Sequence, residues 1–143
     1  MTFFVDANIV IYAAVPSDYR DPCLEVLDAV ASGRADGRLS TAVLEEIWHI
    51  ERSGRAGVLD GLAEHAYTVF SPLLPVTDHA IRAAFDLGPS ALGTNDRVHV
   101  GTCAFHEIDS ILTADGDYDR IREVRRIDPL DEHKRRSLLR GGG

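Results

Sequence analysis

Apolar positions form two patterns along the chain, short continuous runs and repeats at helical spacing, and together these patterns predict a mixed α/β domain. Short apolar runs predict buried strands at residues 2–5, 73–76, 110–113 and 124–127. Elsewhere apolar residues recur at the spacing of one helix face. These helical segments cover residues 8–14, 22–33, 40–53, 56–70, 77–88 and 96–107, with a helical turn at 118–121. Because strands that alternate with helices favour parallel sheets, we expect a three-layer α/β fold with a mostly parallel central sheet and helices on both faces.

Length, composition and cysteine content narrow the class of protein. A chain of 143 residues with 45% hydrophobic and 27% charged residues is expected to form one compact domain. The two cysteines have no spacing typical of zinc sites or disulfide frameworks, which fits a reducing, cytoplasmic compartment. The first apolar stretch has no basic residues before it and is interrupted by Asp6, so neither a signal peptide nor a membrane span is expected.

Four acidic residues occupy positions at which they can meet. Asp6 follows the first predicted strand and Asp115 follows the strand at 110–113. Since a parallel sheet gathers ligand groups at the carboxyl ends of its strands, these two carboxylates can converge. Glu46 and Asp96 lie on predicted helices and can complete a cluster of four. The alternative for each acid is surface charge or a helix N-cap, and this alternative is strongest for Asp96, which begins a helix.

A cluster of carboxylates requires a cation, because like charges in one pocket raise one another's pKa values. Oxygen ligands favour Mg²⁺, or Mn²⁺ in its place, over zinc. The histidines are the competing ligands, but none has zinc-type spacing. His99 lies one turn after Asp96 and can reach the pocket, although a packing role is the simpler interpretation.

The charge of the chain bears on nucleic-acid binding. A formal net charge of −8 opposes contact with phosphates, and bound cations would offset part of it. Lys134 is the only lysine, so the positive charge is almost entirely arginine, which suits bidentate phosphate contact. Tyr12 and Trp48 can stack on bases, although we rank a place in the core higher for both.

Four segments, taken in order, resemble the PIN domain. They are Val-Asp-Ala-Asn at 5–8, Leu-Ser-Thr-Ala-Val-Leu-Glu-Glu-Ile at 39–47, Asn-Asp-Arg-Val-His-Val at 95–100 and Ile-Leu-Thr-Ala-Asp-Gly-Asp-Tyr at 111–118. The resemblance extends from residue 2 to about residue 130. The single-domain size and short first-helix region are similar to the VapC toxins of bacterial toxin-antitoxin pairs.

The resemblance implies a set of site residues. Asp6, Glu46, Asp96 and Asp115 would form the catalytic, metal-binding acids, with the polar neighbours Asn8 and Thr113 supporting them. Glu46 matches the family acid better than Glu45, and its helical neighbours are more apolar, so we expect Glu46 to face inward. Asp115 matches the position after the strand, and Asp117 is kept as an auxiliary ligand.

The implied function is a metal-dependent endoribonuclease that hydrolyses RNA phosphodiester bonds with metal-activated water. It would be the toxin of a VapBC-type pair, with RNA as substrate, a cognate antitoxin as partner and no membrane association. A homodimer is compatible with the sequence. The alternatives are a PIN nuclease in RNA processing without toxin behaviour and a catalytically inactive PIN binding module. We expect the domain to cover residues 1–130 and residues 131–143 to be a basic, mobile tail.

Overall fold

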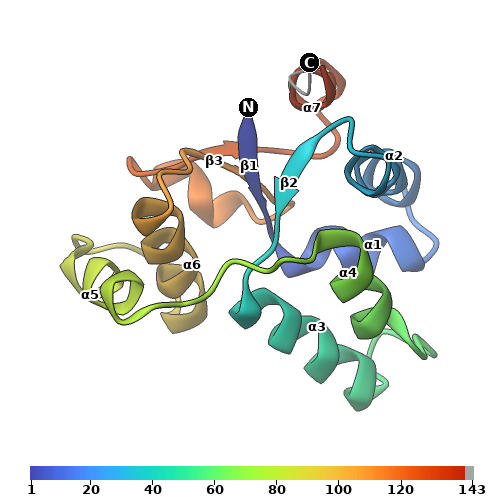
Figure 1. Cartoon of the computed structure of the whole chain (residues 1–143), viewed down its shortest axis with the longest axis horizontal. Helices are drawn as coiled ribbons and strands as arrows, with labels where there is room; N and C mark the ends of the chain where they lie inside the picture. Colours follow the sequence, from blue (N-terminus) through green and yellow to red (C-terminus); the bar gives the residue numbers. More distant parts are fainter. Residues whose placement is uncertain (141–143) are drawn as a thin grey trace.

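The computed structural model describes residues 1–140, which form one layered α/β unit (Figure 1). The strands are β1 (Thr2–Val5), β2 (Asp36–Arg38), β3 (Ser110–Leu112) and β4 (Arg125–Ile127). The α-helices are α1 (Ala7–Ala14), α2 (Arg20–Ala31), α3 (Thr41–Ser53), α4 (Leu62–Phe70), α5 (Asp78–Asp86), α6 (Thr94–Phe105) and α7 (Glu132–Leu139). A 3₁₀ helix, η1 (Gly116–Arg120), lies between β3 and β4. None of the helices in residues 1–140 has the length and apolar content needed to cross a bilayer.

The sheet is parallel throughout, which confirms the predicted fold class. Its strand order is β2-β1-β3-β4, and Val5 of β1 is in register with Leu112 of β3. The chain passes from β1 to β2 on one side and from β3 to β4 on the other, so the direction of strand addition reverses between β1 and β3. Ligands of open parallel sheets bind in the crevice outside the carboxyl ends of the strands at such a reversal.

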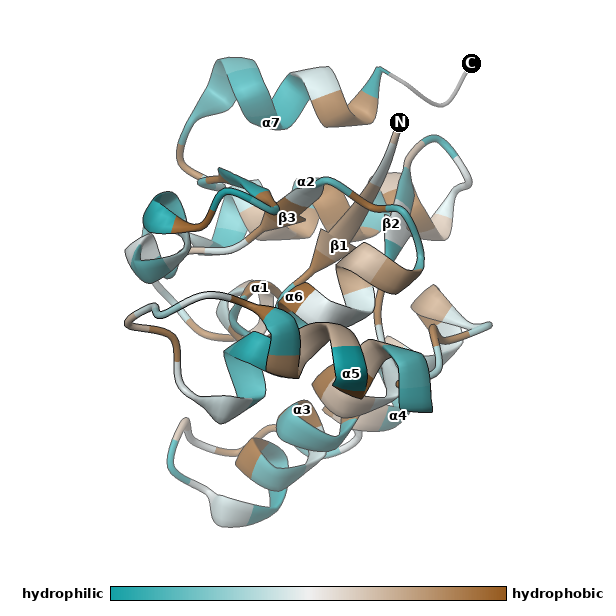
Figure 2. Ribbon diagram, turned by 90° about the vertical axis from the view of Figure 1, so that its left-hand side faces the viewer, coloured by the Kyte–Doolittle hydropathy of each residue, from teal (hydrophilic) through white to brown (hydrophobic). Residues whose placement is uncertain are grey.

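The core lies between the sheet and the helices on its two sides. Phe3, Phe4 and Val5 in β1 and Ile111 and Leu112 in β3 are fully buried. Figure 1 shows α5 and α6 on one side of the sheet and α2 on the other. Figure 2 shows hydrophobic residues gathered along β1 and β3, whereas α7 is largely hydrophilic. Continuous apolar strands are the pattern expected of a sheet that is covered on both faces.

Side-chain caps begin two helices, at the residues with which the predicted segments 40–53 and 77–88 start. The Ser40 hydroxyl accepts a hydrogen bond from the Val43 amide at 3.1 Å, and Thr77 accepts one from the Ala80 amide at 3.1 Å. Each cap satisfies one of the backbone N–H groups that the first turn of a helix leaves free. Gly54, with a φ of 69°, ends α3 in the left-handed conformation that glycine adopts without a steric penalty.

Three local predictions are wrong. Strand β2 is an edge strand of Asp-Gly-Arg, whose polar composition gives no strand signal, and it exists through its pairing with β1. Residues 73–76 do not form a strand, because only Leu74 pairs, with Ser40. The helix expected from residue 56 starts at Leu62, since Gly57 and Gly61 adopt positive φ angles that interrupt a helix.

Residues 132–139, which lie in the segment predicted to be a basic, mobile tail, form α7. Leu138 is fully buried, and the largely buried Arg135 donates to the Pro129 carbonyl at 2.6 Å. Its guanidinium also donates to the Glu25 carboxylate in α2 at 3.1 and 3.2 Å. The charged composition of this segment hid a helix that is held by Leu138 and Leu139 against the core and by the ion pair between Arg135 and the partly exposed Glu25. Residues 141–143, which the same prediction covered, lie outside the described residues.

Helix α6 carries two of the predicted pocket residues and packs closely on α5. The contact depends on Gly101, where an added Cβ would lie 2.3 Å from the Ala80 carbonyl oxygen and 2.8 Å from the Ala84 amide nitrogen. Nothing in the local sequence around Gly101 indicates that α5 is its neighbour. Because these neighbours are backbone atoms, they cannot rotate away as a flexible side chain would.

We therefore expect Gly101→Ala to lower stability although alanine is the better helix former. The propensity gain of about 1 kcal/mol is smaller than the strain of forcing two backbones apart, which costs about 1–3 kcal/mol or more for an overpacked core. Thermal unfolding should show a drop of several degrees. Gly88→Ala is the matched control, since nothing lies within 4 Å of a Cβ at Gly88. An equal or higher melting temperature for Gly101→Ala would contradict the close packing.

Candidate metal centre and active site

Asp6 is the central acid of the site and is held in place by its neighbours. It follows β1 directly and caps α1, with Oδ1 accepting from the Ala7 amide at 2.8 Å. Its Oδ2 accepts from the Thr113 hydroxyl at 2.8 Å and from the Asn8 side-chain amide at 3.3 Å. Only 6% of Asp6 is exposed. A carboxylate bound by several donors has one orientation, as a catalytic ligand requires.

Asn8 and Thr113 join the carboxyl ends of β1 and β3. The Asn8 Nδ2 donates to the Thr113 hydroxyl oxygen at 2.9 Å, and the Asn8 Oδ1 accepts from the Ala114 amide at 3.1 Å. The same Thr113 oxygen accepts from the Asp115 amide at 3.1 Å. These bonds link Asp6 to the loop that carries Asp115, so the two predicted supporting residues lie where they can orient both acids.

Glu46 reaches the site from α3 and meets His99 from α6. The Glu46 Oε1 and the His99 Nε2 are 2.8 Å apart. The His99 side chain is fully buried, and that of Glu46 is 28% exposed. The His99 Nδ1 has no hydrogen-bond partner among the described residues, so Glu46 is the polar anchor of this imidazole. A histidine that is bonded in this way restrains the carboxylate facing the pocket.

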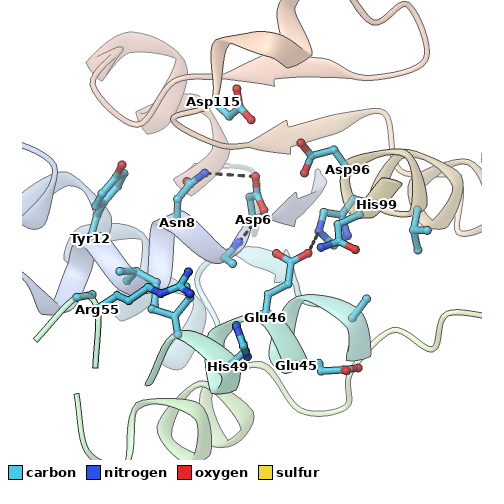
Figure 3. A pocket seen from close by; sticks show the side chains of 17 residues that line it. Asp6, Asn8, Tyr12, Glu45, Glu46, His49, Arg55, Asp96, His99 and Asp115 are labelled. Atoms are coloured by element: carbon cyan, nitrogen blue, oxygen red, sulfur yellow. Dashed lines mark hydrogen bonds and ion pairs between the residues drawn. The ribbon is translucent and has the colours of Figure 1, made fainter. Parts of the chain in front are cut away.

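Asp96 and Asp115 complete the set of four acids. Asp96 lies in the first turn of α6, and Asp115 precedes η1, where its Oδ1 accepts from the Asp117 amide at 2.9 Å. Asp6, Glu46, Asp96 and Asp115 all line one open pocket of about 770 Å³. Figure 3 shows these side chains converging from four separate elements. The pocket lies at the carboxyl ends of β1 and β3, where the strand order reverses.

Two further acids are placed differently. Asp117 is exposed on η1 and does not line the pocket, so the structure does not bring the auxiliary ligand to the other acids. Glu45 borders the pocket, but its carboxylate points away from the acids in Figure 3, whereas that of Glu46 points toward Asp6. The two adjacent glutamates therefore occupy different faces of α3, as the helix period requires.

The structure adds residues that sequence reasoning did not assign to the site. His99 was interpreted as helix packing, although its spacing of three residues from Asp96 was a usable signal. Tyr118 is fully buried in η1, with its hydroxyl close enough to Asp96 to influence that carboxylate. Arg55 lines the pocket from the segment after α3. Nothing in the local sequence pattern places Tyr118 or Arg55 there.

The acids and the histidine shift one another's protonation. Burial raises the pKa of Asp6, against the effects of His99 and of its own hydrogen bonds. Burial also raises the pKa of Asp96, and the charges of Asp115 and Glu46 add to this increase. Burial alone would lower the pKa of His99, but its hydrogen bond to Glu46 and the nearby carboxylates raise it overall. Ionisation of Asp6 and Asp96 is therefore unfavourable in the metal-free site, and a bound cation would offset this cost.

The residues present fit a divalent metal ion. Asp6, Glu46 and His99 each offer a ligand atom, and these atoms lie within 4.8 Å of one another. Asp96, which lies beside His99 on α6, and Asp115 add further oxygen ligands to the pocket. Carboxylate oxygens are the ligands of hard cations such as Mg²⁺ and Mn²⁺. The raised pKa values of Asp6 and Asp96 also favour a bound cation, because a nearby positive charge would lower these pKa values again.

Metal-free protein is expected to lose stability as the pH rises. A folded-state carboxyl pKa above the unfolded value means that the folded protein binds more protons, so the free energy of unfolding falls from about pH 4 upward through the raised pKa values. The raised pKa of His99 has the same sign, since its stabilising charge is lost above about pH 6.5. Thermal melts of chelator-treated protein at pH 5.5 and 8.5 measure this trend, and a higher melting temperature at pH 8.5 would contradict it.

Added Mg²⁺ or Mn²⁺ is expected to reverse that loss at pH 8. A ligand that binds only the folded state at 100 times its Kd adds about 2.7 kcal/mol of stability. In a domain of this size that corresponds to an increase in melting temperature of roughly 10 °C. Glu46→Gln should reduce the shift, and Glu45→Gln should keep it. A melt that neither cation changes would argue against a metal site.

The fold and the carboxylate pocket at the strand reversal define the class of protein. A family model for the PIN domain matches residues 3–124, and the chain belongs to this family. Members of the family are generally nucleases. No curated protein matches the sequence.

Two solved structures share the fold. VapBC2 from Rickettsia felis, bound to a DNA fragment from its promoter, is similar with a TM-score of 0.68 and 15% identity over 90% of this chain and 98% of that chain. FitAcB from Neisseria gonorrhoeae is similar with a TM-score of 0.67 and 16% identity over 91% of this chain and 99% of that chain. At such low identity the likeness extends to the fold alone.

Proposed function

We propose that the chain is a metal-dependent endoribonuclease. The observation that carries the proposal is the convergence of four carboxylates, from Asp6, Glu46, Asp96 and Asp115, in one open pocket of a PIN domain. Metal-dependent nucleases place cations beside the charged substrate, and this pocket offers the ligands for them. The openness of the pocket to solvent suits a polymer that enters and leaves sideways.

The four acids would hold Mg²⁺ or Mn²⁺, and such a cation supplies Lewis-acid chemistry for phosphodiester hydrolysis. Thr113 and Asn8 fix the direction of the Asp6 lone pairs through their hydrogen bonds. His99 restrains Glu46 on the opposite wall. Hydrolysis adds water across the bond and leaves a 5′-phosphate and a 3′-hydroxyl. No side-chain nucleophile is required, which suits a pocket lined by the carboxylates of Asp6, Glu46, Asp96 and Asp115.

The proposed partner is a small antitoxin that covers the pocket. The similar structures are VapBC and FitAB assemblies, and complexes of this type support a toxin role for this chain. A pocket rich in carboxylates on a chain of net charge −8 attracts basic segments. An arginine placed among the acids would pair with them and exclude both cation and substrate.

The free, buried cysteines fit a reducing compartment, so we place the activity in the cytoplasm.

Purified full-length chain should cleave single-stranded RNA only when a suitable divalent cation is present. The test compares Mg²⁺ and Mn²⁺ with a chelator and examines the new ends for 5′-phosphate and 3′-hydroxyl groups. Products of the same kind in the chelated sample would point to a contaminating nuclease. Absence of cleavage with either cation, in protein that retains its melting transition, would favour an inactive PIN binding module.

A further inference from the structure

Arg55 is the only lysine or arginine that lines the carboxylate pocket within residues 1–140. Its guanidinium forms no hydrogen bond or ion pair with the described residues, although acids surround the same space. Most cations beside acidic clusters pair with a carboxylate, as Arg126 does with Asp119 at 2.8 Å. An unpaired arginine at the edge of a carboxylate pocket is available to an anion that arrives from outside.

The backbone of Arg55 is fixed by the end of α3. Gly54 turns the chain with a left-handed φ of 69°, and the Arg55 amide donates to the Ser53 hydroxyl oxygen at 3.2 Å. The Gly57 amide closes the turn on the Gly54 carbonyl at 3.1 Å. The segment is also tied to α4, because the Glu51 carboxylate accepts from the Ala63 amide at 2.8 Å. The position of Arg55 beside the pocket therefore follows from the local structure.

Tyr12 lines the same pocket from α1. Its ring stacks on that of Tyr19, with the ring centroids 4.8 Å apart and an angle of 26° between the planes. This stacking holds the Tyr12 ring as a supported aromatic surface. Figure 3 shows Tyr12 and Arg55 on one side of the pocket, with Asn8 between Tyr12 and Asp6, whereas Asp96 and His99 lie on the other side. An aromatic ring and a free cation thus adjoin the cluster of acids together.

These two side chains match the two parts of a nucleotide. A guanidinium binds phosphate oxygens through a planar pair of N–H donors, and an aromatic ring accepts a base by stacking. The acids themselves cannot attract a phosphate without bound cations, so Arg55 supplies positive charge of the protein's own to the pocket. Binding a substrate on one side of the cluster would leave the acids free to hold their cations.

We propose that Tyr12 and Arg55 form a subsite for the nucleotide next to the cleaved bond, with its base on the Tyr12 ring and its phosphate on Arg55. This inference rests on the proposed function, and it names the substrate more closely. A base can stack on Tyr12 only when it is not stacked within a duplex. The substrate is therefore an unpaired segment of RNA, recognised by backbone charge and base stacking.

The test uses full-length protein and a fluorescently labelled single-stranded oligoribonucleotide of mixed sequence. Cleavage is measured as kcat/KM with Mg²⁺, and binding is measured by fluorescence anisotropy in an Asp6→Asn background. Arg55→Ala is compared with Arg52→Ala, which removes the same charge from an exposed position outside the pocket. The comparison separates a direct phosphate contact from a general change in net charge.

We expect Arg55→Ala to weaken binding and to lower kcat/KM about tenfold, while Arg52→Ala changes either by less than about twofold. The slope of log Kd against log salt concentration should fall by about 0.7 in Arg55→Ala, as for one lost phosphate contact with a single strand. An Arg55→Ala variant that matches Arg52→Ala in all three measurements would overturn the subsite. Loss of Arg55 leaves no pairing partner behind, so folding should be unaffected.

Tyr12→Leu should weaken single-strand binding about tenfold, whereas Tyr12→Phe should bind like the wild type because it keeps the ring. Duplex RNA of the same sequence should bind more weakly and show no dependence on Tyr12. Since Tyr12→Leu can disturb packing, a second measurement uses wild-type protein with RNA that contains 4-thiouridine. Photo-crosslinks that map to Tyr12 are expected, and crosslinks that map only elsewhere would overturn the stacking role.

The outcomes separate a failure of the subsite from a failure of the proposed nuclease function. If the wild-type chain neither cleaves nor binds single-stranded RNA, the proposed nuclease function and the subsite both fail. If the wild type cleaves with Mg²⁺ but neither Arg55 nor Tyr12 affects binding, only the subsite fails.

Discussion

We expect metal-dependent RNA cleavage to be lost, and the fold to be preserved, when any one of the four acids is replaced by its amide. The variants are Asp6→Asn, Glu46→Gln, Asp96→Asn and Asp115→Asn. Each change deletes one negative ligand of the proposed cation and retains nearly the same shape. Loss of a group that stabilises transition-state charge costs on the order of a hundredfold or more in kcat. The measurement is single-turnover cleavage with Mg²⁺, accompanied by a thermal melt of each variant.

The chain provides matched controls for these variants. Glu45→Gln makes the same chemical change one residue away, on a side chain that points out of the acidic cluster. Asp117→Asn does so on an exposed residue outside the pocket. Both should retain activity. An inactive Glu45→Gln beside an active Glu46→Gln would reverse the assignment on α3, and a fully active Asp6→Asn would contradict the mechanism.

Asp6→Asn should also stabilise chelator-treated protein at neutral pH. The Asp6 carboxylate is buried, and its raised pKa means that ionisation is unfavourable in the folded state. A neutral amide removes this cost. The same substitution would therefore raise the melting temperature without metal while removing the catalytic response to metal. Such opposite effects are typical of a residue that serves function at the expense of stability.

The second large effect is expected in living cells. Expression of the wild-type chain alone should arrest bacterial growth, because an endoribonuclease without its inhibitor removes RNA that the cell needs. The Asp6→Asn variant, expressed at the same level, should be harmless. Viable counts after induction measure the difference. This control separates cleavage from a general burden of overproduction.

We expect a small antitoxin to be encoded directly upstream, and co-expression of that protein should relieve the arrest and form a stable complex. An arginine of that protein, placed among the acids, would explain the relief through charge pairing. Size-exclusion chromatography shows whether the two chains co-elute, and whether the free chain forms a homodimer. If the wild type is harmless at high expression and no neighbouring product binds it, the RNA-processing alternative replaces the toxin role.

The parts of this molecule that the sequence predicted are those encoded by local patterns. The apolar run before Asp6 identified β1, and the spacing around Ser40 and Thr77 identified two capped helices. Parallel topology followed from the alternation of elements. The same topology predicts that Asp6 and Asp115 meet at one edge of the sheet, and both residues line the pocket there.

The remaining features depend on contacts between distant segments. The contact of His99 with Glu46 requires the relative placement of α3 and α6, which neither helix encodes alone. The sequence shows Gly101 only as a small residue in a helix, and its role in packing follows from the position of α5 against it. Strand β2 and helix α7 have polar sequences, and each forms because another element supplies its pairing partner. Tertiary contacts outweighed local propensity in each case.

The late position of β3 in the chain has a consequence for synthesis. This strand occupies the interior of the sheet between β1 and β4, yet it begins only at Ser110. A nascent polypeptide that still lacks β3 has neither Thr113 to orient Asp6 nor Asp115 to complete the acids. The ribosome therefore has to translate at least as far as Asp115 before the pocket can form. If the chain has the proposed endoribonuclease activity, this order of synthesis would prevent it from acting on its own message before β3 and the loop after it have been translated.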